Sequence, residues 1–229
     1  MPSEQAGVRR IAALVALTVA SYGLPFGALS VAAGLSIWQT CFLSMVMFTG
    51  ASQFALIGII ATGGVAAGPA AIANAALLGL RNAFYGVTLS RTLGVTGWKR
   101  WVAAHLTIDE STAVAVAQST KPLQRRGFWL TGSGVFLVWN VSSLLGAVLG
   151  DAIGDVKALG LDAAAPAAFL GLLWPRLRRR QALVVAVASA VLAVAATPYL
   201  PAGVPILLTV AVAIVVGVTN VFGDKEPQE

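Results

Sequence analysis

One short stretch, His105-Leu106-Thr107-Ile108-Asp109-Glu110, carries two adjacent carboxyl groups and the single histidine of a strongly apolar chain. A charged side chain at the centre of a bilayer costs about 2.5 to 3.5 kcal/mol on insertion scales, so it is retained where it faces protein, water or a partner. On a continuous helix, His105 and Asp109 would share a face. Asp109, Glu110 and His105 are therefore the candidate proton-coupling residues. The alternatives are a structural ion pair or a carboxylate that caps a half-helix.

Another charged side chain, Arg81, lies within an apolar stretch. If a helix begins at residue 69, Arg81 lies roughly 18 Å along it at about 1.5 Å per residue, well inside a hydrocarbon layer. A buried guanidinium needs a carboxylate partner, and its planar fork also suits bidentate binding of a substrate carboxylate. The alternative is that the long side chain reaches toward the membrane boundary.

The elements that must position these groups are apolar. Of 229 residues, 58% are hydrophobic and only 10% are charged, so the chain lacks the polar surface of a soluble globule of this size. Residues 11–80 contain no Asp, Glu, Lys or Arg, whereas a membrane-spanning helix needs only about 20 apolar residues. We expect a single integral membrane domain over residues 1–229.

Charge clusters and Gly/Pro breaks divide the chain into eight hydrophobic segments. Their apolar runs are continuous and do not alternate, which favours helices over barrel strands. The expected fold class is an all-α polytopic membrane protein with six to eight transmembrane or re-entrant helices. The segments are 11–33, 37–61, 69–90, 101–120, 127–150, 158–175, 181–197 and 203–223.

The basic residues constrain how these segments are threaded. If all eight cross and the N-terminus is inside, ten Lys and Arg lie inside and four outside, with Arg81 within a segment. If one of the first three segments and the fourth do not cross, the split becomes thirteen to one. The positive-inside rule favours the second threading, which requires re-entrant or broken helices at two places.

Two stretches are candidates for these breaks. Gly23-Leu24-Pro25-Phe26-Gly27 places a proline between two glycines, which removes a backbone donor and predicts a broken helix, with a simple kink as the alternative. The fourth segment carries the two carboxyl groups. Broken helices at membrane depth line cavities, and in transporters they supply free helix ends to ligands. The spacing of Gly23 with Gly27, and of Gly146 with Gly150, also allows close helix packing.

Several function classes lack support. The net charge of +6 comes from short basic clusters between apolar blocks, which are typical of loop anchors and not of a nucleic-acid surface. The sequence has no nucleophile paired with a base, no Cys/His metal spacing and no phosphate loop. We therefore expect no enzyme activity, no metal and no cofactor. Trp139 lies in the middle of a segment, and we do not interpret it as part of a ligand cage.

Three blocks carry a resemblance to a known family: Phe48-Thr49-Gly50-Ala51-Ser52-Gln53-Phe54, Leu80-Arg81-Asn82-Ala83-Phe84-Tyr85-Gly86 and Asp109-Glu110. With these blocks the chain resembles the AzlC family of branched-chain amino-acid permeases over nearly its whole length. The likeness includes Gly160-Leu161-Asp162 followed by Pro166 and Phe169. One departure is the run Ala163 to Ala165, where bulkier side chains are expected, and this leaves the size of the substrate side chain open.

The resemblance implies a multi-pass protein of the bacterial inner membrane that exports branched-chain amino acids, driven by the proton gradient. It also implies a small multi-span partner subunit of the AzlD type. Carried over by position, Asp109 and Glu110 match the family's acidic pair, and Asp162 and Pro166 suggest a further helix break. The expected substrate-binding residues are Gly50, Ala51, Ser52, Gln53, Arg81, Asn82 and Tyr85.

The alternative to a transporter is a membrane scaffold or assembly subunit without a substrate path. It predicts that Arg81 pairs with the carboxylates in a dry core that no cavity reaches. A transporter instead predicts that Arg81, Asp109 and Glu110 meet at one water-accessible pocket.

Overall fold

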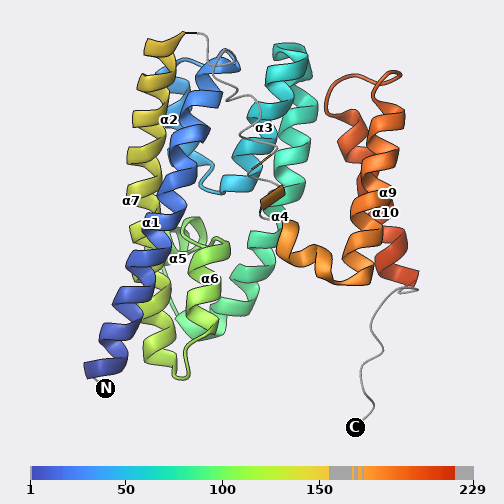
Figure 1. Cartoon of the computed structure of the whole chain (residues 1–229). Helices are drawn as coiled ribbons and strands as arrows, with labels where there is room; N and C mark the ends of the chain where they lie inside the picture. Colours follow the sequence, from blue (N-terminus) through green and yellow to red (C-terminus); the bar gives the residue numbers. More distant parts are fainter. Residues whose placement is uncertain (1, 155–166, 168–169, 172, 220–229) are drawn as a thin grey trace.

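The computed structural model describes residues 2–154, 167, 170–171 and 173–219 (Figure 1). Regular secondary structure in this part of the chain is entirely helical, so the predicted all-α class is confirmed for it. Two helices, α1 and α7, are long and apolar enough to cross a membrane, and four others are shorter and apolar. The α-helices are α1 (Pro2–Ala32), α2 (Ile37–Val46), α3 (Gly50–Gly63), α4 (Gly68–Leu93), α5 (Trp98–His105), α6 (Asp109–Val116), α7 (Lys121–Ile153), α9 (Arg180–Ala196) and α10 (Val204–Thr219), with 3₁₀ turns η1 (Val65–Ala67) and η3 (Trp174–Arg178).

Helices α1 and α7 run parallel and pack along most of their length (Figure 1). The predicted helix break at Gly23–Gly27 is wrong, because α1 continues through Pro25. A helix tolerates the loss of the backbone N–H donor at a proline when a neighbouring helix packs against the site. That is the case here: a Cβ added at Gly27 would overlap the Ser143 carbonyl oxygen, and one at Gly146 would overlap that of Leu24. The glycines therefore bring two backbones into contact.

A first helical hairpin consists of α2 and α3, which are separated by the break at residues 47–49. Its outer ends lie where α1 ends and α4 begins (Figure 1). Its break lies in the middle of the bundle, where the rings of Phe48 and Phe136 are 5.1 Å apart and Gly50 lies against Trp139. The predicted segment 37–61 is thus a pair of half-helices, so the early break lies in the second segment and not, as the sequence predicts, in the first.

A second hairpin, α5 and α6, enters from the opposite end and breaks at residues 106–108. Its outer end lies near the start of α7, where Gln124 Nε2 donates to the Gln118 carbonyl oxygen at 3.0 Å. Its break lies farther along α7, because a Cβ at Gly132 would lie 3.1 Å from Leu106. The predicted break in the fourth segment is therefore confirmed, and the two hairpins meet in the middle of the bundle (Figure 1).

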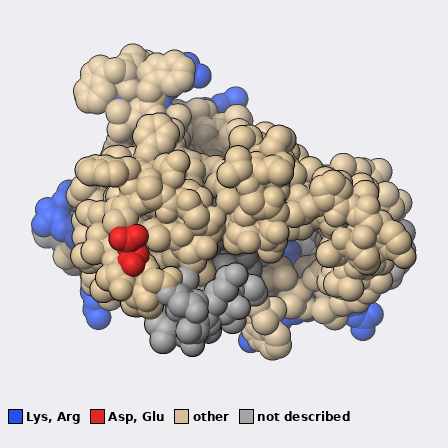
Figure 2. Space-filling model, turned by 90° about the horizontal axis from the view of Figure 1, so that it is seen from above, with Lys and Arg blue, Asp and Glu red and all other residues tan. Residues whose placement is uncertain are grey.

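The two ends of the bundle differ in charge. We call the end where α1 and α7 begin the basic end. There Arg125 Nε donates to the Thr92 carbonyl oxygen at 2.7 Å, and Arg126 Nη1 donates to Gln5 Oε1 at 3.0 Å, so these residues tie α4 and α1 to α7. Figure 2 shows the opposite end, with acidic atoms at one place and basic atoms only around the rim. The basic end carries Arg91, Lys99, Arg100, Lys121, Arg125 and Arg126.

Helices α9 and α10 form a separate pair beside α4 (Figure 1). Buried Asn74 on α4 holds the turn before α10, because its Nδ2 donates to the Gly203 carbonyl oxygen at 3.0 Å. The two helices match the predicted segments 181–197 and, as far as residue 219, 203–223. Most of segment 158–175, with the expected break at Asp162 and Pro166, lies outside the described residues.

Candidate functional site

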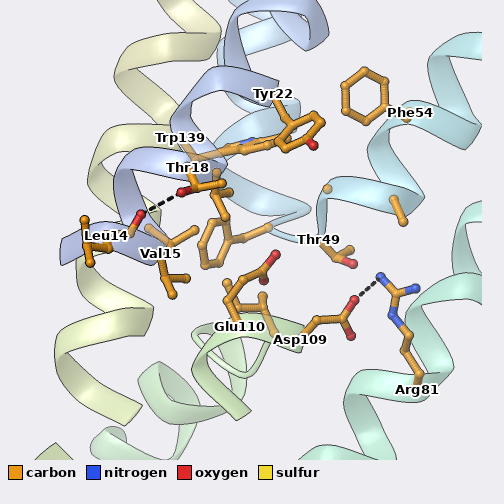
Figure 3. Close-up of a pocket in the computed structure, with 16 residues that line it drawn as sticks. Leu14, Val15, Thr18, Tyr22, Thr49, Phe54, Arg81, Asp109, Glu110 and Trp139 are labelled. Carbon is orange, nitrogen blue, oxygen red and sulfur yellow. Dashed lines mark hydrogen bonds and ion pairs between the residues drawn. The ribbon is translucent and has the colours of Figure 1, made fainter. Parts of the chain in front are cut away.

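A cavity of about 440 Å³ lies where the two hairpin breaks meet (Figure 3). Its volume is within the range of small-molecule sites. Long helices α1 and α7 supply one wall, and the starts of α3 and α6, with Arg81 of α4, supply the other. It is lined by Leu14, Val15, Thr18, Val19, Tyr22, Phe48, Thr49, Gly50, Ala51, Phe54, Arg81, Ile108, Asp109, Glu110, Val135 and Trp139.

The N-terminus of α3 faces this cavity through Gly50 and Ala51. Thr49 precedes the helix in an extended conformation, and its side chain makes no capping hydrogen bond. The first N–H groups of a helix have no intrahelical acceptor, and the helix dipole adds partial positive charge there. A Cβ at Gly50 would lie 3.3 Å from the Trp139 ring, so glycine lets the indole approach this end closely. The α3 start is an electropositive end without an acidic residue of its own.

The N-terminus of α6 has the opposite character, because Asp109 and Glu110 occupy its first turn. Ser111 shapes the break before it: the Ile108 N–H donates to Ser111 Oγ at 3.1 Å, and Ser111 Oγ donates to the Leu106 carbonyl oxygen at 2.6 Å. A side chain that the sequence analysis did not single out therefore stabilises the break and leaves the two carboxylates free to reach the cavity.

The two carboxylates have different surroundings. Arg81 Nη2 lies 3.0 Å from Asp109 Oδ2, with about a third of each side chain exposed. Figure 3 shows Asp109 reaching toward Arg81, whereas the Glu110 carboxylate points into the space between Asp109 and α1. No ion pair joins Glu110 to another of the described residues. Arg81, Asp109 and Glu110 thus converge on one pocket, as a transporter predicts.

Aromatic and aliphatic side chains form the rest of the wall. Trp139 is 3% exposed, and its ring lies 5.8 Å from Phe26 and 6.4 Å from Phe54. Val15 and Val135 line the same space. Trp139 was not among the predicted binding residues. Its position in the middle of an apolar segment, away from the aromatic belt, was the signal that could have identified it.

Several predicted site residues lie elsewhere. Ser52 and Gln53 are fully buried behind the cavity, and Gln53 Nε2 donates to the Leu43 carbonyl oxygen at 3.3 Å, which ties α3 to α2 across the break. Asn82 lines a second cavity between α4 and α5, and Tyr85 lines neither of the two. Among the described residues, no three His, Cys, Asp or Glu side chains cluster as a metal site would require.

The expected pairing of His105 with Asp109 on one helical face is wrong, because the break at residues 106–108 separates them. The His105 ring instead lies 5.8 Å from Phe48 and 5.5 Å from Phe136, at a different surface depression. Helical spacing predicts a shared face only when the helix is continuous. His105 is therefore not part of the carboxylate site.

Comparison with known proteins adds one finding. A family model described as AzlC protein matches residues 14–153, which contain every residue that lines the central cavity. No curated protein and no solved structure matches the chain. The matched region is more than half of the chain, and it confirms the resemblance carried by the three sequence blocks. The chain belongs to the AzlC family, a membrane transporter family associated with branched-chain amino-acid transport.

Proposed function

We propose that this protein is a secondary transporter that exports branched-chain or similar apolar amino acids across the bacterial inner membrane. One observation carries the proposal: an apolar cavity in which one half-helix presents an electropositive N-terminus without an acidic residue and another presents two carboxylates. Free helix ends at the meeting point of broken helices bind ligands and ions in transporters.

The two helix ends suit the two charges of an amino acid. The substrate carboxylate binds the N–H groups of Gly50 and Ala51, where an anion is favoured. The ammonium group binds Glu110, which forms no salt bridge with another of the described residues. Arg81 is the weaker candidate for the carboxylate, because Asp109 already occupies it.

The side chain of the substrate lies against Val15, Phe48, Phe54, Val135 and Trp139. These groups form an apolar wall for an aliphatic side chain. Each CH₂ group that is buried against it stabilises the complex by about 0.8 kcal/mol. No polar side chain is needed on that wall, which favours leucine, isoleucine and valine over polar amino acids.

We further propose the threading of the chain. Helices α1, α4 and α7 cross the membrane, and the two hairpins are re-entrant from opposite sides. The basic end is cytoplasmic under the positive-inside rule. With segment 158–175, α9 and α10 also crossing, this threading leaves thirteen Lys and Arg inside and one, Lys157, outside. A small AzlD-type subunit completes the assembly, and the proton gradient drives export through Asp109 and Glu110.

A scaffold without a substrate path is the second candidate. It requires the Arg81–Asp109 pair to lie in a dry core, whereas the pair borders a cavity and is about one third exposed. The transporter is therefore favoured.

The test is leucine efflux from bacterial cells that carry the chain with its partner subunit and are loaded with a leucine-containing dipeptide. We expect faster efflux than from cells without the chain, and loss of that gain when Asp109→Asn and Glu110→Gln are combined. Unchanged efflux in the double variant, at equal protein level, would remove the proton role. Absence of any gain from the wild-type chain would contradict transport.

A further inference from the structure

Residues 2–63 and 68–116 repeat one order of elements: a long helix, a four-residue connection, a half-helix, a three-residue break and a second half-helix. Both connections contain a glycine with positive φ, namely Gly34 at 95° and Gly94 at 57°. In both units the third residue after the break is a fully buried serine, Ser52 or Ser111.

The two units are inverted relative to each other. Helices α1 and α4 run in opposite directions, and their hairpins enter from opposite ends (Figure 1). Inverted repeats of this kind permit alternating access, in which the two units exchange conformations around a fixed site. In that scheme the α2–α3 hairpin closes the cavity toward one end of the bundle, and the α5–α6 hairpin closes it toward the basic end.

One feature breaks the symmetry. Arg81 lies twelve residues before the end of α4, and the residue twelve before the end of α1 is Ala20. Asp109 is the first residue of its half-helix, and the corresponding residue of α3 is Gly50. Only the second unit therefore has an ion pair at this position, which joins its long helix to its hairpin.

A second cavity of about 540 Å³ lies between α4 and α5, and neither Arg81 nor Asp109 lines it. Asn82, which follows Arg81, and Thr107, two residues before Asp109, both line it. It extends to Leu93, Val95 and Arg100 at the basic end. The α4 backbone and the second break, held together by the Arg81–Asp109 pair, thus separate the central cavity from a space that reaches the basic end.

We propose that the Arg81–Asp109 ion pair is a latch that keeps the central cavity closed toward the basic end, within a pair of inverted units that alternate. Release of the latch lets the α5–α6 hairpin move from α4 and joins the two cavities into one path. The α2–α3 hairpin has no such pair to break, so the latch biases the protein toward the state closed at the basic end. This inference rests on the proposed transport function for its purpose, but its test needs no substrate.

The test is thiol labelling of the full chain in proteoliposomes. Cys41 is the only cysteine, so Cys41→Ser gives a background for the reporter Ala51→Cys in the central cavity and for Thr96→Cys, which identifies the side of the basic end. With membrane-impermeant reagent on that side, Asp109→Asn should raise the labelling rate of the Ala51→Cys reporter about fivefold, the population shift expected from loss of a partly exposed ion pair. The exchange Arg81→Asp with Asp109→Arg should restore slow labelling.

Glu110→Gln is the matched control, because it removes the neighbouring carboxylate without touching the pair. Labelling is measured with a cationic and with an anionic reagent. Opening of the cavity raises the labelling rates of both reagents, whereas a change in local charge shifts the two rates in opposite directions. Unchanged rates in folded Asp109→Asn protein, an equal rise in Glu110→Gln, or an exchange variant that labels fast would each overturn the latch. Failure of leucine transport alone would leave these rates as they are and would count only against the proposed function.

Discussion

At the scale of single residues, two neighbouring carboxylates on one half-helix have different partners. Asp109 is paired with Arg81, whereas Glu110 faces the cavity and has no ion pair with a described residue. Adjacent residues on a helix point about 100° apart, so the backbone itself separates their directions. This division is the reason we propose substrate recognition for Glu110 and gating for Asp109.

Glu110→Gln should therefore lower the transport efficiency for leucine by about tenfold or more, since a hydrogen bond to a charged group is worth about 1.5 to 3 kcal/mol. The discriminating measurement is inhibition of leucine transport by leucinamide, which keeps the ammonium group, and by 4-methylpentanoate, which lacks it. The wild type should prefer leucinamide, and Glu110→Gln should lose that preference. If the variant keeps it, another group binds the ammonium.

The position of Trp139 in the cavity wall predicts that this side chain limits the size of the substrate. Trp139→Phe removes part of the apolar wall between Gly50 and Phe54, and the enlarged cavity should shift preference from leucine toward phenylalanine. Competition between the two amino acids measures the shift. Trp129→Phe on the same helix is the control, because Trp129 does not line the cavity. An equal shift in both variants would indicate a general effect of repacking α7.

At the scale of helices, the sequence predicted one of the two breaks and misplaced the other. The stretch around Pro25 has the residues that end helices, yet packing against α7 carries α1 through it. Residues 47–49 contain neither proline nor glycine, and the local signals, Thr49 as an N-cap type and Gly50 after it, are weak within a continuous apolar run. The break is stabilised by tertiary contacts, with Gln53 bonded to Leu43 across it and Trp139 against Gly50. Contacts between distant segments decide such cases.

Gly27→Ala should destabilise the protein strongly, because the new Cβ would overlap the α7 backbone at Ser143. Backbone atoms cannot rotate away, so we expect a loss of about 1 to 3 kcal/mol from overpacking. Gly7→Ala is a matched control on the same helix, since nothing lies within 4 Å of its added Cβ. Thermal unfolding in detergent should show a clearly lower midpoint for Gly27→Ala and little change for Gly7→Ala. Similar midpoints would mean that α1 and α7 are not in backbone contact.

At the scale of the whole molecule, the count of basic residues indicated which segments are interrupted better than the Gly/Pro signals did. The count favours a threading in which the fourth segment and one of the first three do not cross, and the structure has helical hairpins at 37–63 and 98–116. Charge does not indicate which early segment is interrupted, because residues 11–80 contain no charged side chain. Loop polarity carries no information where the loops on both sides are neutral.

The re-entrant threading makes a prediction that an all-crossing threading cannot share. In the Cys41→Ser background, Leu35→Cys and Val65→Cys lie at the two outer ends of the first hairpin and should both react from outside the cell. Thr96→Cys and Ser119→Cys flank the second hairpin and should both react from the cytoplasm. If every segment crossed, the two members of each pair would react from opposite sides. Labelling of right-side-out and inside-out vesicles with an impermeant reagent therefore decides between the threadings, and opposite sidedness within either pair would remove the inverted repeat and the latch with it.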